Sequence, residues 1–356
     1  MVLPRVSFEK LDLALLAALL VACGSDDGSA GERGAGGGGG TSSVAAPSCD
    51  GAPKDCGPSA NESCCSSPRV PGGTYLRDYD EVSMGSAGPD YQATVSDYRL
   101  DEFEVTVGRF RRFVAAWVSG WRPAAGAGKH AHLRSGEGLL NSAAQGGFET
   151  GWDPSFSQKL ASDAAAWSQN LSCDPSYQTW TDIAGANDAR PANCLTWFEA
   201  YAFCIWDGGF LPSEIEWNYA ATGGSEQRVY AWSSPPTSTT IDESYASYYV
   251  DTTRQCFGDG MNGCAVTDLI RVGTKPAGNG RWGQADLLGN VSEWTLDWYT
   301  ELYAKTCDNC AHLTAETFRA FRGQDFFTGG LGCSLRDYRD PSERKVTYGA
   351  RCARRP

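Results

Sequence analysis

The chain has 356 residues, of which 21% are charged and 42 are glycine, and its formal net charge is −13. This length is enough to bury a full core, and the many glycines together with 12 tryptophans predict an irregular, loop-rich globular fold. The acidic balance excludes nucleic acid as a partner, because a phosphate backbone requires a basic face.

The N-terminus has the pattern of an export signal. Arg5 and Lys10 flank the start of an apolar run, 11–22, which is too short to span a bilayer. The run ends in LVAC at Cys23, which resembles the bacterial lipobox, so we expect 1–22 to be a lipoprotein signal peptide. The alternative is a Sec signal cleaved elsewhere or a frayed helix. Lipid on Cys23 would anchor the exported protein to the inner or outer membrane of the bacterial cell envelope.

Two segments separate the signal from the globular domain, which we place at 69–356. Residues 23–48 are rich in glycine and serine, and their composition predicts a flexible tether. Residues 49–68 have little hydrophobic content but hold four cysteines, which predicts a small collar stapled by disulfides. These cysteines are Cys49, Cys56, Cys64 and Cys65, and the sequence leaves their pairing open.

The 14 cysteines of an exported chain indicate disulfides before metal ligands. If Cys23 carries lipid, thirteen remain, so at least one is unpaired or bonded outside the chain. Cys307 and Cys310 have the spacing of a redox CxxC motif, but no strand-to-helix context of the thioredoxin kind surrounds them. We therefore expect a local structural disulfide there.

The first half of the domain gives a few local signals. Residues 70–76 predict a turn that leads into a strand, and 96–105 predict a second strand. Thr106 is a candidate cap of a helix whose apolar stripe we expect in the core. That stripe comprises Val107, Phe110, Val114 and Trp117. His130 and His132 lie in a Gly/Ala-rich stretch without a nearby third ligand, so we expect exposed loop histidines and no metal.

The clearest local pattern lies in 193–224. Thr196 and Glu199 form one capping box, and Ser213 and Glu216 form a second, because each pair has the three-residue spacing of reciprocal capping. A Gly-Gly pair follows each apolar segment, at 208–209 and 223–224, which is typical of helix ends. The sequence therefore predicts two short capped helices.

This same segment resembles the sulfatase-modifying factor family, whose founding activity is that of the formylglycine-generating enzyme. The resemblance rests on WxEAxAxC…LPSExEWNYAA from Trp197 onward, and it extends in order from about 69 to 356. Further matches are VPGGT at 70–74, Glu104-Val-Thr, GNVSEW at 289–294, the Arg319–Arg322 segment and GARCAR at 349–354. It implies an α+β, C-type-lectin-like fold with little regular secondary structure.

The resemblance also implies a calcium site in the segment DLLGNVSE, 286–293. Asp286 and Glu293 would be side-chain ligands, and Gly289 and Val291 would be carbonyl ligands, which suits a cation that prefers oxygen. The alternative is an Asx-turn that only closes the loop. The family's second calcium site would fall between Ser247 and Asp268, where we assign no ligands.

The family's catalytic residues are two cysteines, five positions apart, that bind copper(I). Counting from Arg322-Gly323, the first position falls on Thr328 and the second on Cys333. Two thiolates are the coordination that copper(I) prefers, and a hydroxyl does not replace a thiolate. The sequence therefore predicts a domain with half of the catalytic pair, in which Cys333 is the remaining candidate catalytic residue and copper binds only if the protein is active.

The resemblance further implies a disulfide between Cys204 and Cys352. Local pairing elsewhere would join Cys256 to Cys264, Cys307 to Cys310 and Cys173 to Cys194, with the four collar cysteines paired among themselves. Cys333 is then the residue left over.

Two functions follow from this pattern. The first is a non-catalytic binding or structural module that holds an unidentified protein or glycan through aromatic loops. We expect those loops to present Trp152, Trp180, Trp232, Tyr245 and Tyr248. The alternative is an active oxidase that converts a peptide cysteine to formylglycine, using Cys333 and a second copper ligand. The fold by itself does not decide between them.

Overall fold

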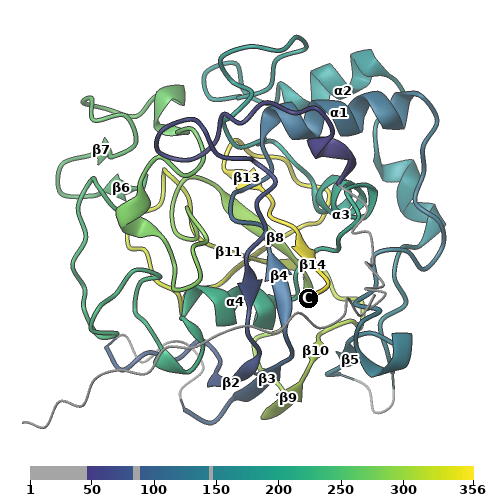
Figure 1. The fold of residues 1–356 in the computed structure, drawn as a ribbon, viewed down its shortest axis with the longest axis vertical. Coiled ribbons are helices and arrows are strands. Elements are labelled where there is room, and N and C mark those ends of the chain that lie inside the picture. The colour runs from purple at the N-terminus through teal and green to yellow at the C-terminus, as the bar shows by residue number, and fades with distance from the viewer. Residues whose placement is uncertain (1–45, 83–88, 144–146) are drawn as a thin grey trace, which may run out of the picture. The chain divides into compact units, whose positions relative to one another are not determined.

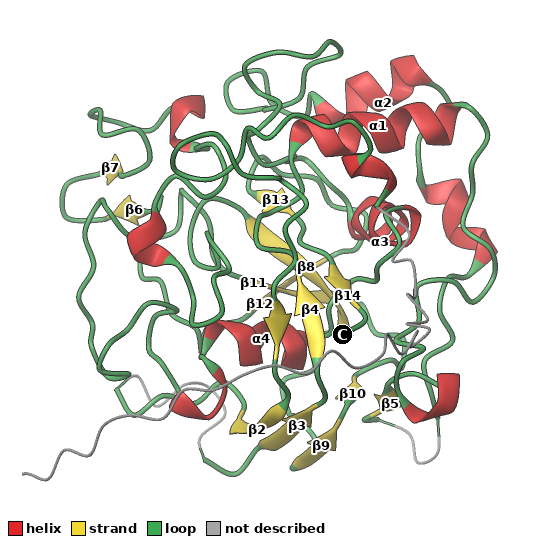
Figure 2. Cartoon of the chain, in the orientation of Figure 1, coloured by secondary structure: helices red, strands yellow, loops and turns green. Residues whose placement is uncertain are grey.

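The computed structural model describes residues 46–82, 89–143 and 147–356. Loops and turns form most of this chain, as Figure 2 shows. The expected signal peptide, the Cys23 lipidation site and the tether as far as residue 45 lie outside the described residues. Within the described part, none of the helices combines the length and the apolar character needed to cross a bilayer.

The helices are short, and their first turns begin at the predicted caps. The Thr106 side chain accepts from the backbone N–H of Arg109, and both predicted capping boxes form. The α-helices are α1 (Val107–Val118), α2 (Ala164–Leu171), α3 (Trp197–Trp206) and α4 (Glu214–Ala221). Single 3-10 turns occur at Pro47–Cys49, Arg134–Gly136, Pro154–Lys159, Gly224–Glu226, Val266–Asp268 and Pro276–Gly278.

The strands form several small sheets, and the one that positions the candidate site is at the centre of Figure 1. This sheet has the order β12 (Asp337–Arg339), β11 (Arg319–Arg322), β8 (Ser292–Trp298) and β13 (Tyr348–Gly349). A second has the order β1 (Arg69–Val70), β4 (Tyr98–Leu100) and β14 (Ala353–Arg354), and a third β2 (Gly73–Leu76), β3 (Gln92–Val95) and β9 (Thr306–Asp308). Two-stranded pairs join β10 (Cys310–Ala311) to β5 (Leu140–Asn141) and β6 (Tyr249–Val250) to β7 (Gln255–Cys256).

The strand predicted for 96–105 is shorter than expected, because only β4 joins a ladder. Beyond it, the backbone N–H of Asp101 donates to the carbonyl of Cys352, and that of Val105 donates to the carbonyl of Ala350. These isolated bonds to the C-terminal segment replace a continuous ladder. They satisfy the backbone of a buried segment without regular structure.

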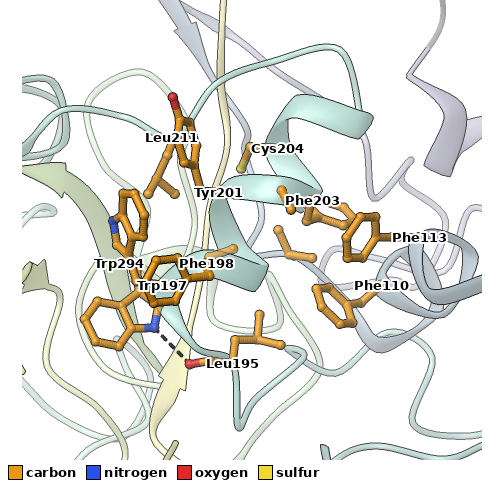
Figure 3. Packing of buried hydrophobic residues seen from close by; sticks show 14 of the residues in the cluster. Phe110, Phe113, Leu195, Trp197, Phe198, Tyr201, Phe203, Cys204, Leu211 and Trp294 are labelled. Atoms are coloured by element: carbon orange, nitrogen blue, oxygen red, sulfur yellow. Dashed lines mark hydrogen bonds between the residues drawn. The ribbon is translucent and has the colours of Figure 1, made fainter. Parts of the chain in front are cut away.

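Aromatic side chains from α1 and α3 form much of the core (Figure 3). Phe110 and Phe203 are stacked with their ring centroids 5.6 Å apart, and Phe113 meets Phe203 edge-on at 5.8 Å. Trp294 on β8 is also buried, and its indole N–H donates to the carbonyl of Leu195 at 2.9 Å. The predicted stripe of α1 is therefore a packing surface, and it fixes α1 against α3.

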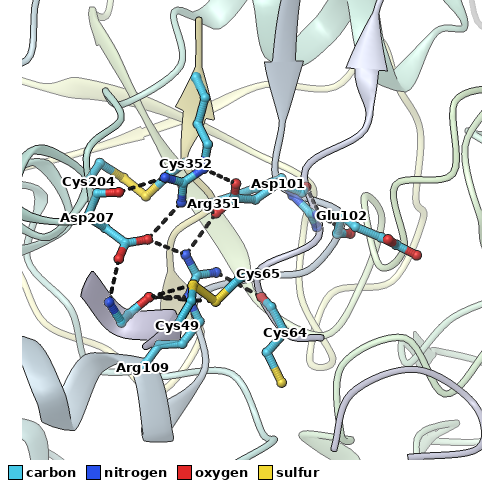
Figure 4. A network of polar contacts seen from close by, with 12 residues as sticks. Cys49, Cys64, Cys65, Asp101, Glu102, Arg109, Cys204, Asp207, Arg351 and Cys352 are labelled. Carbon is cyan, nitrogen blue, oxygen red and sulfur yellow. Dashed lines mark hydrogen bonds and ion pairs between the residues drawn. A yellow bond between two sulfur atoms is a disulfide. The ribbon is translucent and has the colours of Figure 1, made fainter. Parts of the chain in front are cut away.

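One buried arginine, Arg109 on α1, contacts both the collar and the rest of the domain (Figure 4). Its guanidinium donates to the carboxylates of Asp101 and Asp207, at 2.9 Å and 2.6 Å, and to Ser48 Oγ and the Cys64 carbonyl, at 3.0 Å and 3.1 Å. Ser48, the last residue of the expected tether, is buried, so the packed chain includes it.

Candidate functional site

The motif segments that are distant in sequence meet in the central sheet. β11 pairs with β8 so that Phe321 lies opposite Trp294 and Arg322 opposite Glu293, while β13 runs parallel to β8 on its other side. The segment 323–336 leaves the end of β11 and returns as β12. Thr328 and Cys333 both lie in this returning segment.

Three arginines around this segment belong to the frame of the fold. Arg322 donates to Asp78 Oδ1 at 2.6 Å and to Glu214 Oε1 at 3.0 Å, and Arg336 forms a bidentate pair with Glu214 at 2.8 Å and 2.7 Å. Arg319 lies between the rings of Trp197 and Trp298, 3.7 Å from each centroid. These contacts give the three arginines a structural role.

Cys333 is fully buried, and its thiol donates to the carbonyl of Ala221 at 3.2 Å. Its own backbone is held on both sides, because its N–H donates to the Val229 carbonyl and the amide of Asn218 donates to its carbonyl at 2.7 Å. Burial, and secondarily the Asp80 carboxylate, raise the pKa of the Cys333 thiol well above its usual range. A protonated thiol in this environment is a poor nucleophile and a poor metal ligand.

Thr328 lies elsewhere in the segment, on the wall of a cavity of about 250 Å³. Ser292, Asp325, Arg339, Lys345 and Tyr348 also line this cavity, with the rings of Phe321 and Phe327, and Cys333 does not. We call it the Thr328 cavity. The two family positions therefore do not face one another across it.

The described residues do not fit copper(I). Twelve cysteines form six disulfides, and Cys333 is the free cysteine of the described chain. Copper(I) requires a second soft ligand beside the first, and the first family position offers the Thr328 hydroxyl instead. No step of a copper-dependent reaction can be assigned to these residues.

The cysteine pairing expected for the domain is confirmed. Cys204 and Cys352 are joined across 148 residues, and the local pairs Cys173–Cys194, Cys256–Cys264 and Cys307–Cys310 are present. The collar pairing that the sequence left open is Cys49–Cys65 and Cys56–Cys64. Cys333 is the residue left over, as the arithmetic predicted.

The expected calcium segment has a suitable excess of negative charge. Glu104, which the sequence pattern did not single out as a ligand, lies with Asp286 and Glu293 near Arg351, and Lys275 also acts on Asp286. Burial and the two neighbouring carboxylates raise the pKa of Glu104 well above its usual range. Burial also raises the pKa of Asp286 to about 6. Carboxylate and carbonyl oxygens are the donors that calcium prefers.

The geometry of this segment is less favourable for calcium binding than its charge is. Glu293 accepts from the Arg351 guanidinium at 2.7 Å and from the indole N–H of Trp217 at 2.7 Å. Asp286 accepts from the backbone N–H of Gly273 at 2.6 Å. Gly289, at φ 87°, approaches the Ser247 carbonyl so closely that an added Cβ would lie 2.2 Å from that oxygen. The segment therefore offers the kinds of oxygen donor that calcium prefers, but the Glu293 carboxylate is already hydrogen-bonded to Arg351.

Among the described residues, Asp55, Cys56 and Cys64 form the one group of acidic, thiol or imidazole donors that lie within 4.8 Å of one another. The two sulfurs form a disulfide, which removes them as metal ligands. In the region of the second family calcium site, Asp268 accepts from the backbone N–H groups of Gly258, Asp259 and Ala265. That carboxylate closes its own loop.

The interpretation of His130 as an exposed loop histidine is wrong. His130 is fully buried, with Nδ1 3.0 Å from Glu149 Oε2 and Nε2 3.0 Å from Glu216 Oε2. Burial would lower the pKa of His130, but the two carboxylates outweigh it and raise the pKa to about 10. Sequence patterns missed this because Glu216 lies 86 residues away.

The prediction that five aromatic residues present a binding surface is also wrong for most of them. Trp152, Trp180 and Tyr248 are buried. Trp232 and Tyr245 are partly exposed and stacked on one another, with ring centroids 5.3 Å apart. The Gly/Ala-rich surroundings of Trp152 gave no sign of the core that covers it.

Short sheets around a disulfide-joined, loop-rich core define an α+β domain of the C-type-lectin-like class. The chain belongs to the sulfatase-modifying factor family, since the family description "Sulfatase-modifying factor enzyme 1-like domain" matches residues 53–356. The match begins within the collar, which the structure also packs against the domain.

Similar proteins include both an active and an inactive type. The chain is 24% identical to the formylglycine-generating enzyme of Mus musculus over 315 residues, which is 80% of this chain and 73% of that protein. It is 28% identical over 240 residues to the inactive Cα-formylglycine-generating enzyme 2 of Mus musculus, covering 65% of this chain and 68% of that protein. PvdO from Pseudomonas aeruginosa shares the fold, with a TM-score of 0.50 and 19% identity over 81% of this chain and 93% of PvdO.

Proposed function

We propose that this protein is an envelope lipoprotein whose sulfatase-modifying-factor domain works as a non-catalytic binding module and does not generate formylglycine. The observation that carries the proposal is the state of Cys333, a buried thiol bonded to the Ala221 carbonyl with no second thiolate beside it. Two-thiolate copper(I) binding is what the family's oxidase chemistry requires, and one shielded sulfur does not supply it.

The test is an anaerobic titration of the purified full chain with copper(I), beside an assay of aldehyde formation on a CxPxR peptide. We expect no tight copper site and no aldehyde, with the mouse formylglycine-generating enzyme as the active control. Turnover of the peptide, or one tight copper site that Cys333→Ser abolishes, contradicts the proposal.

The alternative is an active, copper-dependent oxidase that acts on a protein cysteine. The relatives favour it, because the similarity to the mouse formylglycine-generating enzyme covers 80% of this chain. Peptide turnover in the assay above would establish it.

The proposal includes an anchor and an ion. Lipid on Cys23 would hold the protein in the cell envelope, and Cys23→Ser should abolish incorporation of labelled fatty acid.

Calcium on Asp286, Glu293 and the carbonyls of Gly289 and Val291 would offset the excess of buried carboxylates in that segment. A protein or glycan ligand would contact the exposed edges of Trp232 and Tyr245, and Trp232→Ala should then remove binding on a glycan array.

A further inference from the structure

The Thr328 cavity has the features of a small-molecule site. Its volume of about 250 Å³ is enclosed by residues from β8, β11, β12 and β13 and from the returning segment. The rings of Phe321 and Tyr348 meet with centroids 5.2 Å apart and give it an apolar wall, and the partly exposed ring of Phe327 lies at its edge. Small-ligand sites typically combine such apolar walls with a few polar groups.

One polar group of the cavity is a carboxylate without a counter-charge. Asp325 is only 8% exposed, and no cation in the described chain pairs with it. Its hydrogen bonds come from neutral donors, the Phe327 backbone N–H at 2.9 Å and the Ser292 hydroxyl at 3.1 Å, with the hydroxyls of Thr328 and Thr347 close by. A buried carboxylate is stabilised by a cation, so a ligand ammonium group would supply what the protein lacks.

The cavity lining also carries positive charge. Arg339 pairs with Asp337 at 2.7 Å, and Lys345 pairs with Glu343 at 2.9 Å. Arg339 donates through Nη1 to Asp337 and to the Tyr338 carbonyl, and its guanidinium also lies against the Tyr348 hydroxyl. Both cations therefore keep donors that a ligand carboxylate can accept.

The hydroxyl of Tyr348 adds a buried polar group beside these two cations. Tyr348 lines the cavity and is 3% exposed, and its hydroxyl lies close to the side chains of Arg339 and Lys345, although no hydrogen bond of good geometry joins them. A buried hydroxyl whose hydrogen bonds are poorly formed can also bond to an oxygen of a ligand. The cationic side chains of Arg339 and Lys345 act on the same hydroxyl.

We propose that the Thr328 cavity binds a free α-amino acid with an apolar side chain. Its ammonium group would contact Asp325, its carboxylate would contact Arg339, Lys345 and the Tyr348 hydroxyl, and its side chain would lie against the phenylalanine rings. This inference assigns a ligand class to the binding module and so rests on the proposed function, but its test is carried out without copper or peptide and can fail separately.

The experiment is isothermal titration calorimetry of the purified full chain with three matched probes. Phenylalanine carries both charges, phenylalaninamide lacks the carboxylate and N-acetylphenylalanine lacks the ammonium. We expect saturable one-to-one binding of phenylalanine, and binding at least about tenfold weaker for each of the other two, because each loses a charge-assisted hydrogen bond. Absence of phenylalanine binding overturns the proposal. Equal binding of phenylalaninamide also overturns it, because that result indicates a peptide N-terminus.

Variants test whether phenylalanine binds in the Thr328 cavity or elsewhere on the surface. Asp325→Asn keeps an acceptor for the Phe327 N–H but removes the charge, so phenylalanine binding should weaken at least about tenfold. Asp308→Asn changes an exposed aspartate, 64% accessible, and should leave binding unchanged. If Asp325→Asn does not fold, Thr328→Phe, which fills the cavity from its wall, replaces it. Unchanged phenylalanine binding in a folded cavity variant contradicts the proposal.

Discussion

His130 Nε2 lies 3.0 Å from Glu216 Oε2, although the two residues come from a Gly/Ala-rich loop and from the first turn of α4. The same carboxylate accepts from the backbone N–H of Ser213 at 2.8 Å, so one glutamate both caps a helix and binds the histidine. Glu149 holds the other ring nitrogen. The histidine therefore joins a loop to α4 as a buried cation between two anions.

The first prediction concerns the pH dependence of stability. The folded pKa of His130, about 10, lies above its unfolded value of 6.5. Its contribution to the free energy of unfolding is thus complete below about pH 6.5 and is lost as the pH rises through about 10. His130→Asn should cost about 3–5 kcal/mol at neutral pH, since it leaves two buried carboxylates uncompensated. Urea unfolding of both proteins between pH 6 and pH 10 should show a difference that shrinks with rising pH.

His312→Asn is the matched control for this prediction. His312 faces Glu316, whose side chain is 50% exposed, at 3.7 Å, so its loss should cost less than about 1 kcal/mol. If His130→Asn does not fold, ¹⁵N spectra of the wild-type protein at pH 8 report instead whether the His130 imidazole is protonated. A neutral His130 ring at that pH would contradict the prediction.

A second prediction concerns the reactivity of Cys333. Because its thiol is buried and its pKa is raised, the native protein should not react with iodoacetamide at pH 8, whereas the denatured, unreduced protein should be alkylated at Cys333. Peptide mapping identifies the modified residue, and Cys333→Ala should remove the signal. Fast labelling of Cys333 in the native chain would contradict its burial, and labelling of a domain cysteine other than Cys333 would show that the pairing is different.

A third prediction concerns the long-range disulfide. Cys204 and Cys352 close a loop of 148 residues, and Cys173 and Cys194 close one of 21. In the chain-entropy account, the bridges contribute about 5 and about 3 kcal/mol, because a longer loop restricts the unfolded chain more. Replacing each pair by alanines and comparing free energies of unfolding in urea tests this order. Equal losses for the two pairs would refute the entropic explanation.

A fourth prediction concerns calcium. If calcium occupies the segment 286–293, the melting temperature of the full chain should fall when EGTA removes the ion, and saturation at about 100 times the Kd corresponds to about 2.7 kcal/mol. Asp286→Asn should abolish this difference, whereas Asp308→Asn, at an exposed carboxylate outside both expected calcium segments, should keep it. Identical melting curves with calcium and with EGTA would leave the segment as a closed turn held by Arg351.

Much of the fold could be predicted because its signals are local. Thr196 with Glu199, and Ser213 with Glu216, satisfy their own helix ends within three residues, so the sequence is enough to place α3 and α4. The order of the family motifs predicted the fold class, and the pairing expected for the other cysteines left Cys333 as the free one. The extent of strands was harder, because the ladder of β4 ends where Asp101 begins to bond to the C-terminal segment.

The candidate site itself shows what sequence and tertiary structure each decide. The sequence and its resemblance to the family were enough to predict Thr328 at the first catalytic position and Cys333 at the second, because that prediction uses only the spacing within a family motif. Only the tertiary structure decided that Thr328 lines a cavity while the Cys333 thiol binds Ala221, and that Asp325 and Tyr348 share that cavity. The physical reason is that burial, pKa and partner choice arise from contacts between residues far apart, such as Arg322 and Asp78, which are separated by 244 positions.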